Sequence, residues 1–549
     1  MMKKNLTKVL FIAITSFAMV SCNNPSKMAE YADQVKISCT PEVLEVVAGE
    51  INANVAVSFP AEYFHPKAVL EVIPVLIYQG GEIAGKPFVY QGEKVIDNYK
   101  TVTKEGATIQ EKIHFDYVPG MEKSQLVARA KVVYKGKEYS FPEDIKIADG
   151  ANTTYMLVEK SGAYSFKEDK YQEVIPETAE AQILYLVNSS TVRPSQIKSN
   201  DIKDFEQTLK NLMNDERRAV KSTDIIAYAS PEGAIDFNNN LSGKREATAT
   251  KAFEKITKKI EIGDVNTKSI GEDWDGFKSL VDNSTIQDKD LIIRVLSMYS
   301  DPNVREREIR NMSKVYQSLA KTILPELRRA RFIANIEYKN YSAEELKTLV
   351  ESNIDVLDEE ALLRTASLIK DNDIKLNIYN KAINKYNSER GKYNAAIVSL
   401  NKGENADAKS YLAKIENKDC CCYKNAMGVI AMRNGKNEEA AKWFAESKAK
   451  EAKANSAVLD ILNGKYADAV SKLAGTGDEN EGLAFILTGQ LDKASAAIKC
   501  KCPHAAYQKA IIAARKGDAA TANKELQTAA KRADYEKRIL TDIEFAKIK

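Results

Sequence analysis

A glycine followed five residues later by an alanine recurs along the C-terminal part of the chain. The pairs are Gly403/Ala408, Gly435/Ala440, Gly464/Ala469, Gly489/Ala494 and Gly517/Ala522. A short motif that returns every 25 to 32 residues is typical of a helical solenoid. In such a hairpin the glycine ends one helix, and the small alanine lets the next helix pack closely. Because residues 342–549 are also rich in Ala and Leu and lack strand-like alternation, we predict that they form an all-α solenoid.

The clearest copy of this motif, residues 425–447, resembles a tetratricopeptide repeat. Gly428 lies seven residues before Gly435, and Phe444 lies four residues after Ala440, as in that repeat. The resemblance implies stacked helical hairpins whose groove binds peptides or protein partners. The alternative is a purely architectural spacer.

The N-terminus has the pattern of an exported lipoprotein. Lys3, Lys4 and Lys8 precede an apolar run at 11–20, which has the length of a signal-peptide core but is too short to span a bilayer. Ser21-Cys22 after that core resembles a bacterial lipobox. The resemblance implies that residues 1–21 are removed and that Cys22 carries a lipid, followed by a polar tether over 22–32. An ordinary secretory signal with an incidental cysteine is the alternative.

The charge of the chain bears on its partners. The formal net charge is +3, and the three lysines of the signal segment account for all of it, because residues 1–21 contain no acid. A mature chain without net charge lacks the basic surface that nucleic-acid binding requires. We therefore expect no nucleic-acid partner.

Residues 33–160 alternate apolar and polar side chains in short runs. The runs cover 51–59, 68–78, 111–117 and 125–134, and glycines separate them. Several strands at this spacing predict an N-terminal β-sandwich domain. His65 and His114 have no partners at ligand spacing, so we predict no metal site in this domain.

Residues 180–340 alternate strand-like and helix-like patterns. We expect strands at 182–187, from Ile225, at 265–270 and at 331–338. We expect helices at 201–212 and from about 242 to 258, the second capped by Ser242. The order β-α-β-α-β with a late strand predicts a helix-backed sheet. The helical residues from about 273 to 325 exceed what such a domain needs, so we interpret them as an insertion.

One stretch of this region, IIAYASPEGAIDFNNNLSGKREA at 225–247, carries a family resemblance. The residues that fall at the offsets found in the peptidoglycan-binding domain of the OmpA family are Gly233, Asn238, Leu241, Ser242 and Arg245. The pair Arg328-Arg329 before the last strand is also similar to the family. The Ala-Ser-Pro-Glu-Gly loop and the Gly-Glu-Asp-Trp segment at 271–274 look like a branch of OmpA-like proteins from the Bacteroidetes cell envelope. The whole chain thus resembles a Bacteroidetes-type OmpA-like envelope lipoprotein with C-terminal tetratricopeptide-like repeats.

The resemblance implies a peptidoglycan site in this domain. A stem peptide presents an amine and a carboxylate, which call for an acid and an arginine. Arg245 matches the arginine, but Ser230 stands where the family has its aspartate. Glu232 is the nearest carboxylate that could replace it, and Asp236 is another. Asn238 either belongs to the site or only holds the loop through backbone hydrogen bonds. The alternative is a domain that keeps the fold and has lost or changed its ligand.

Five cysteines gather in two clusters within the predicted solenoid. They are Cys420, Cys421 and Cys422, and Cys500 and Cys502. The offset of 82 residues that aligns Gly435 with Gly517 also aligns the two clusters, so both are predicted before the first helix of a repeat. In an exported protein we expect disulfides first and free thiols second. A metal site that includes His504 comes third, because C-x-C is not the usual spacing of structural zinc.

No motif of a known enzyme class stands out in the sequence. GxSxG, Walker, GxGxxG and HExxH motifs are missing, and we expect no catalytic residues, no cofactor and no metal. We therefore predict a multidomain, non-catalytic envelope scaffold: an N-terminal β-sandwich, a central α/β OmpA-like domain and a C-terminal all-α helical-repeat solenoid.

The predicted partners follow from these parts. The lipid on Cys22 would anchor the chain in the outer membrane, on its periplasmic face because no acid-rich tether follows. The OmpA-like domain would contact peptidoglycan, and the repeats would recruit protein partners. The alternatives are an accessory subunit of an outer-membrane assembly, secretion or fimbrial complex without wall binding, and a cell-wall-modifying enzyme.

Overall fold

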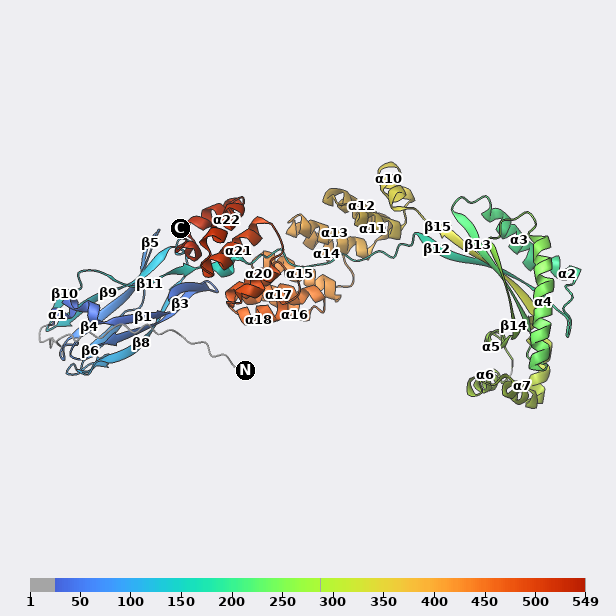
Figure 1. Cartoon of the computed structure of the whole chain (residues 1–549), viewed down its shortest axis with the longest axis horizontal. Helices are drawn as coiled ribbons and strands as arrows, with labels where there is room; N and C mark the ends of the chain where they lie inside the picture. The colour runs from blue at the N-terminus through green and yellow to red at the C-terminus, as the bar shows by residue number, and fades with distance from the viewer. Residues whose placement is uncertain (1–24, 287, 549) are drawn as a thin grey trace. The chain divides into compact units, whose positions relative to one another are not determined.

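The computed structural model describes residues 25–286 and 288–548, which form two compact units (Figure 1). The first unit combines the chain up to Lys167 with Lys392–Lys549, and the second unit is Glu168–Gly391. The second unit is therefore inserted in the sequence between the two halves of the first. The sequence predicts three domains in linear order and does not indicate that the N-terminal β region and the repeats share one unit.

Eleven strands build the β region of the first unit. Their bounds are β1 (Lys36–Thr40), β2 (Val43–Val47), β3 (Glu50–Phe59), β4 (Val69–Tyr78), β5 (Gly81–Ala84), β6 (Phe88–Gly92), β7 (Lys100–Val102), β8 (Ala107–Asp116), β9 (Ser124–Tyr134), β10 (Lys137–Ser140) and β11 (Ile145–Asn152). They are joined in the order β1-β3-β2-β11-β9-β4-β6-β7, with β8 on β3, β5 on β4 and β10 on β9. The N-terminal region is therefore rich in sheet.

The strands fold over a common apolar core. An apolar cavity of about 40 Å³ is lined by side chains of β1 and β3 on one side and of β4, β6, β9 and β11 on the other. Phe59 of β3 packs edge-on against Tyr90 of β6, with ring centroids 5.2 Å apart. The alternating burial along β3 places one side of the strand in this core and the other toward solvent.

The predicted tether at 22–32 is in part packed against the β region. Its described residues include α1 (Lys27–Glu30), where Met28 is fully buried. The hydroxyl of Tyr63 donates a hydrogen bond of 2.7 Å to the Met28 carbonyl. This part of the predicted tether is therefore packed, because the buried methionine outweighs the polar character of its neighbours.

Helices make up the other half of the first unit. Their bounds are α13 (Glu389–Asn401), which begins at the end of the second unit, α14 (Asn405–Ala413), α15 (Cys421–Arg433), α16 (Asn437–Glu446), α17 (Lys450–Leu462), α18 (Tyr466–Leu473), α19 (Glu481–Leu487), α20 (Leu491–Ala497), α21 (Pro503–Arg515), α22 (Ala519–Ala529) and α23 (Ala533–Thr541). From α15 to α22 they pair as hairpins, and each hairpin packs on the next. This region is all-helical and built of stacked helical hairpins, as the sequence predicts.

The glycine–alanine motif has the structural role that the sequence predicts. All five glycines have left-handed backbone angles, with φ between +72° and +79°, which ends the first helix of each hairpin. The five paired alanines are fully buried, at 0% exposure. The helices therefore approach each other where the side chain is smallest.

The second unit is built on a four-stranded sheet. Its strands are β12 (Val174–Leu184), β13 (Arg218–Ala229), β14 (Asp264–Glu272) and β15 (Arg329–Lys339), in the order β12-β15-β13-β14. β13 and β14 are parallel, and β15 is antiparallel to both of its neighbours. α2 (Pro194–Ile197), α3 (Asn200–Leu212) and α4 (Ile235–Ile256) connect the first three strands.

One face of this sheet is covered by helices. Phe205 of α3 and Phe253 of α4 share a core with Ile225 and Phe332 of the sheet, and all four are buried. The helices α5 (Trp274–Asp282), α6 (Lys289–Met298), α7 (Pro302–Asn311), α8 (Ser313–Thr322) and α9 (Leu324–Leu327) lie between β14 and β15 in sequence and have an apolar core of their own. The unit ends with α10 (Ala343–Ser352), α11 (Glu359–Leu368) and α12 (Asn372–Tyr386), so part of the predicted 342–549 solenoid belongs to it.

The start of α4 differs from the expectation. The helix begins at Ile235, so Ser242 lies inside it and is not its cap. The hydroxyl of Ser242 donates to the Asn239 carbonyl and accepts a hydrogen bond of 3.1 Å from the Gly271 N–H. Ser242 thus joins α4 to the end of β14, a contact that the local sequence does not reveal.

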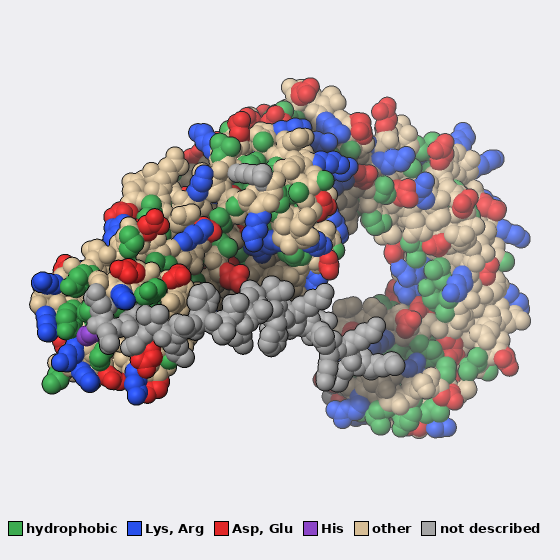
Figure 2. All heavy atoms as spheres, turned by 60° about the vertical axis from the view of Figure 1, so that its left-hand side comes forward, with side chains coloured by type: hydrophobic (Ala, Val, Ile, Leu, Met, Phe, Trp, Pro, Cys, Tyr) green, Lys and Arg blue, Asp and Glu red, His purple; other side chains and the backbone are tan. Residues whose placement is uncertain are grey.

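The surface of the described residues carries both charges. On the face drawn in Figure 2, Lys and Arg side chains are interspersed with Asp and Glu side chains. Among the described residues, no helix combines the length and the apolar character that crossing a bilayer requires.

Candidate functional site

The predicted peptidoglycan residues lie around the loop that joins β13 to α4 in the second unit. Ser230 and Glu232 are in the loop, and Asn238 and Arg245 are on α4. The hydroxyl of Ser230 donates a hydrogen bond of 2.6 Å to the Glu232 carboxylate. Ser230 therefore orients Glu232, one of the two acids that the sequence analysis considers in place of the missing aspartate.

Arg245 is the most deeply buried member of this group, at 1% exposure. Its guanidinium donates to three backbone carbonyls: Ser189 at 3.0 Å, Tyr228 at 2.9 Å and Leu186 at 3.2 Å. The same group lies over the ring of Tyr185, 5.0 Å from its centroid. Burial lowers the pKa of Arg245 to about 10. Arg245 thus ties the segment after β12 to the end of β13, and three of its five N–H donors are used by the backbone in this conformation.

Glu232 forms its ion pair with Arg328 and not with Arg245, the arginine that the sequence analysis considers. Arg328 donates to both Glu232 oxygens, at 2.8 and 3.1 Å, in a bidentate pair. Burial raises the pKa of Glu232, but the hydrogen bonds from Arg328 and Ser230 outweigh it and lower the pKa overall. Arg329, the next residue, pairs with Asp273 at 2.7 Å. The Arg328-Arg329 pair, at the start of β15, therefore neutralises two acids of the second unit.

Asn238 holds the loop, one of the two roles considered for it. Its amide donates to the Gly233 carbonyl at 3.2 Å and to Glu272 at 2.8 Å. The other Glu272 oxygen accepts from the indole of Trp274 at 2.9 Å. The four predicted site residues are thus near one another, and each of them makes hydrogen bonds within the protein.

A second candidate site lies in the first unit, where residues 158–167 run as an extended segment against the repeats. We call these residues the strap. The strap follows the 3₁₀ helix Thr154–Leu157, has no helical or strand structure, and leads into the inserted unit at Glu168. It is the teal coil beside the repeat helices in Figure 1. One side of the strap packs on the repeats, and several of its side chains stay exposed.

Four buried asparagines bind the strap through its main chain. Asn480, at the start of α19, accepts from the Glu159 N–H at 2.8 Å and donates to the Glu159 carbonyl at 3.0 Å. Asn455 of α17 binds both groups of Ala163, at 2.6 and 2.8 Å. Asn394 of α13 binds both groups of Lys167, at 2.8 and 2.9 Å. The bound strap residues are thus spaced by four, and they run opposite to the order of the repeats.

The fourth asparagine, Asn425 of α15, supports the central contact. It donates to the Ala163 carbonyl at 2.9 Å and accepts from Asn455 at 2.9 Å. All four asparagines are at most 2% exposed. An amide side chain offers one donor and one acceptor, which match the carbonyl and the N–H of one extended residue. We call this surface of α13, α15, α17 and α19 the strap-binding face.

Side chains fix the position of the strap at its N-terminal end. The Glu159 carboxylate lies 2.9 Å from Arg532 and 3.2 Å from Nδ1 of His504. His504 also contacts the Tyr535 hydroxyl at 2.5 Å and Gln508 at 2.7 Å. Burial lowers the pKa of His504 below its ordinary value, although Glu159 acts in the opposite direction.

Gly162 fixes the position of the strap at its centre. It has a φ of +76°, and an added Cβ would lie 2.7 Å and 2.8 Å from the two methyl groups of Val429. Both the backbone angle and the space exclude a larger residue here. The strap-binding face thus requires glycine at this position of the strap.

The sequence analysis missed this site, although it carries a signal. An amide residue precedes each motif glycine by nine or ten positions: Asn394, Asn425, Asn455, Asn480 and Gln508. The asparagines coincide with the residues that bind the strap. The strap itself has no periodicity that would identify it, because its hydrogen bonds to the asparagines join residues 227 to 321 positions apart.

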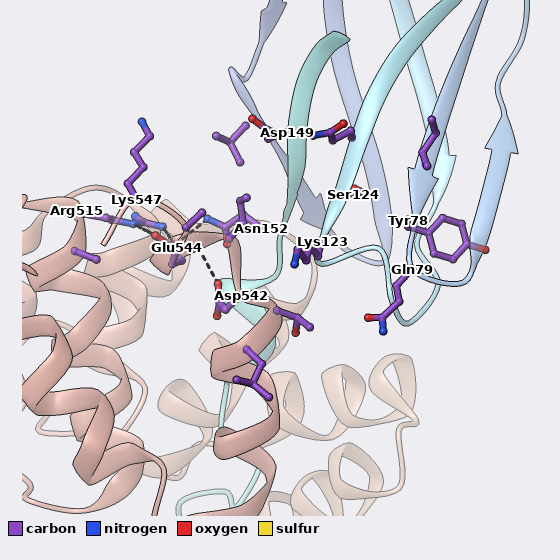
Figure 3. Close-up of a pocket in the computed structure, with 18 residues that line it drawn as sticks. Tyr78, Gln79, Lys123, Ser124, Asp149, Asn152, Arg515, Asp542, Glu544 and Lys547 are labelled. Atoms are coloured by element: carbon purple, nitrogen blue, oxygen red, sulfur yellow. Dashed lines mark hydrogen bonds and ion pairs between the residues drawn. The ribbon is translucent and has the colours of Figure 1, made fainter. Parts of the chain in front are cut away.

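A cleft of about 1020 Å³ lies between the β region and the last helices of the first unit (Figure 3). Tyr78, Gln79 and Lys123 line one side, and Arg515 and Glu544 lie on the other. Glu544 accepts from Arg515 at 2.5 Å, from Asn152 at 2.8 Å and from the Thr154 hydroxyl at 2.6 Å. Burial raises the pKa of Glu544, but these partners outweigh it and lower the pKa overall. The acid therefore fastens the β region to the repeats.

The two cysteine clusters occupy equivalent places in the repeats. Cys420 is the residue before α15 and Cys502 the residue before α21. The sulfurs of Cys420 and Cys422 lie 2.8 Å apart, and the Cys502 N–H donates to the sulfur of Cys500 at 3.1 Å. All cysteines of the described residues are free thiols in this structure, and disulfide bonding between them stays a prediction.

The ionisation of these thiols differs between the clusters. Burial raises the pKa of Cys422 to about 11, whereas hydrogen bonds from Cys502 lower the pKa of the exposed Cys500.

Two other sites considered from the sequence are a metal site that includes His504 and a lipidation site at Cys22. Within residues 25–286 and 288–548, no three His, Cys, Asp or Glu side chains are grouped so that they could hold a metal ion. The predicted lipidation site, Cys22, lies outside the described residues.

Comparisons with known proteins give distant likenesses only. No family model matches the chain, and no curated protein matches it. A crystal structure of a tetratricopeptide repeat protein from Parabacteroides merdae is similar with 14% identity and a TM-score of 0.29, over 37% of this chain and 91% of that protein. The crystal structure of the APC/C hetero-tetramer Cut9–Hcn1 is similar with 13% identity and a TM-score of 0.29, over 59% of this chain and 71% of that one. At these values neither likeness identifies a family or a function.

Proposed function

We propose that this protein is a non-catalytic scaffold of the bacterial cell envelope, held in the outer membrane by a lipid on Cys22. The repeat helices are the observation that carries the scaffold role. They bind an extended polypeptide segment through buried asparagines, which is the chemistry of a protein-binding surface. The lipid anchor and the periplasmic location rest on the N-terminal sequence pattern.

The second unit is, in this proposal, an OmpA-like domain. The element order supports it: β12, α3, β13, α4 and β14 alternate, and a late strand, β15, enters the middle of the sheet. This is the arrangement that the resemblance at 225–247 implies. The helices α5 to α9 are an insertion between β14 and β15 with their own core.

We propose further that this domain serves the scaffold without a peptidoglycan clamp on Arg245. The geometry favours this alternative because the Arg245 donors are used by three carbonyls and Glu232 is neutralised by Arg328. A ligand carboxylate would have to displace backbone contacts from a buried arginine. An accessory subunit of an outer-membrane assembly, secretion or fimbrial complex fits these features better than a wall anchor.

Two fractionation experiments test the proposal. Wild-type protein should be found in the outer-membrane fraction, and a Cys22→Ser variant should be released from it. Purified protein should remain in the supernatant when peptidoglycan sacculi are sedimented, and it should release no soluble muropeptides from them. Saturable sedimentation with sacculi would contradict the absence of wall binding, and muropeptide release would contradict the non-catalytic role.

Tagged full-length protein, extracted from envelopes with mild detergent, should co-purify with a defined set of partner proteins. The matched variant is Asn455→Ala, which alters the strap-binding face and is used once circular dichroism shows that it is folded. A complex that is identical in the two proteins would place partner binding on another surface. An envelope extract that yields no partner at all would contradict the scaffold role.

A further inference from the structure

We propose that the strap-binding face is a receptor for an extended segment of a partner protein, and that the strap occupies it until such a segment replaces it. The inference rests on the proposed scaffold role and names the partner's chemistry. The occupant in the present structure is the chain's own residues 158–167, so the face is not open to a partner as long as the strap is bound.

The main-chain contacts define the first requirement for a partner segment. The segment needs three residues at a spacing of four, equivalent to Glu159, Ala163 and Lys167. At each of them the N–H donates to an asparagine oxygen and the carbonyl accepts from an asparagine amide. Proline has no N–H, so the segment must lack proline at these three positions. The asparagines contact only backbone atoms, so these contacts set no other condition on the side chains at the three positions.

The side-chain contacts define the second requirement. The counterpart of Gly162 must be glycine, because of its φ of +76° and the contact with Val429. Three residues earlier, Arg532 and His504, which lie outside the four helices of the face, contact a carboxylate that Glu159 supplies in the strap. Five residues after the glycine, the ammonium of Lys167 lies over the ring of Tyr393, 5.2 Å from its centroid. The fitting segment is therefore extended, with an acid three residues before a glycine and a cation five residues after it.

The way in which the strap is held allows a partner segment to replace it. The strap is held along one side and keeps exposed residues, Lys160 and Ser165, on the other. It is attached to the same chain at both ends, so it competes at a high effective concentration, of order millimolar for a short tether. A partner segment at micromolar concentration therefore binds only when the strap has been weakened or when the partner is tethered nearby.

A peptide-binding experiment tests the proposal on the full chain. The probe is a fluorescent peptide of residues 157–169, LVEKSGAYSFKED, and the reading is its anisotropy. The wild-type chain should not bind the probe at micromolar concentrations. A Gly162→Val chain, whose own strap cannot seat against Val429, should bind it, and adding Asn455→Ala should weaken this binding at least tenfold. The probe with Gly162→Val should not bind any of these chains.

Circular dichroism must show that the Gly162→Val chain is folded; if it is not, Gly162→Ala is used, which places a single methyl group against Val429. Failure of the folded variant to bind the probe would overturn the proposal, and so would equal binding by the wild-type chain. A wild-type dimer that dissociates on addition of the probe would identify a second copy as the occupant and would also overturn it. If peptide binding fails while the full-length protein still brings down partners, only the inference fails and the scaffold role stands.

Discussion

Replacing Asn455 by alanine tests the strap contact at its centre. The change removes three hydrogen bonds: from the Ala163 N–H at 2.6 Å, to the Ala163 carbonyl at 2.8 Å and to Asn425 at 2.9 Å. The Ala163 carbonyl keeps its bond from Asn425, but the Ala163 N–H loses its acceptor. At about 1 kcal/mol for each hydrogen bond, with up to about 1 kcal/mol more for the unsatisfied N–H, the free energy of unfolding should fall by about 2–4 kcal/mol.

The two tryptophans allow this loss to be assigned to the first unit. Trp443 lies in the repeats and Trp274 in the inserted unit, so a Trp274→Phe background leaves Trp443 as the reporter. With a urea dependence of about 3 kcal/mol/M, the midpoint of the Trp443 transition should fall by about 1 M. Asn463→Ala changes an exposed asparagine just after the same helix and should shift the midpoint by less than about 0.2 M. Equal midpoints for Asn455→Ala and the background protein would refute the strap contact as a source of stability.

Three further predictions concern the rest of the molecule. Arg245→Met should destabilise the second unit by about 3–5 kcal/mol, measured by Trp274 fluorescence in urea, because three backbone carbonyls, of which that of Tyr228 is buried, lose their charged donor; an unchanged midpoint would show that the arginine is free. Because burial lowers the pKa of His504, its contribution to stability is complete above about pH 6.5 and is lost as the pH falls through the folded-state pKa. The Tm should therefore drop from pH 7 to pH 5, and His504→Gln should reduce that drop; an equal drop in both proteins would contradict the assignment. In the reduced protein, iodoacetamide should modify the exposed Cys500 first and the buried Cys39 last, as followed by mass spectrometry, and the reverse order would contradict the lowered thiol pKa of Cys500.

The helical repeats could be predicted from the sequence because their signal is local and periodic. Gly435 and Ala440 are representative of the five glycine–alanine pairs. The glycine adopts the left-handed backbone angle that ends α15, and the alanine is fully buried in α16. The N-terminal strands were found for the same reason, since alternation along β3 directly reflects one buried face. These features depend on contacts within a helix or a strand, which the pattern of side chains records.

The candidate sites could be predicted only in part, because spacing fixes a position and not the partners of a side chain. Arg245 lies on α4 beside the loop, but its donors go to carbonyls that are 17 to 59 residues away. Glu232 pairs with Arg328, 96 residues further on. The strap depends on contacts over more than 200 residues, and no pattern in 158–167 predicts its structure. Long-range pairing of this kind has no local signature.

Hydrogen exchange of the wild-type strap tests the central claim most directly. The strap has no helix or sheet hydrogen bonds of its own, so free N–H groups in it would exchange at the rate of an unfolded chain. If the repeats hold the strap through asparagines, the N–H groups of Glu159, Ala163 and Lys167 should be protected, with less protection at the residues between them. Exchange of all three at the unfolded rate in the native protein would contradict the account.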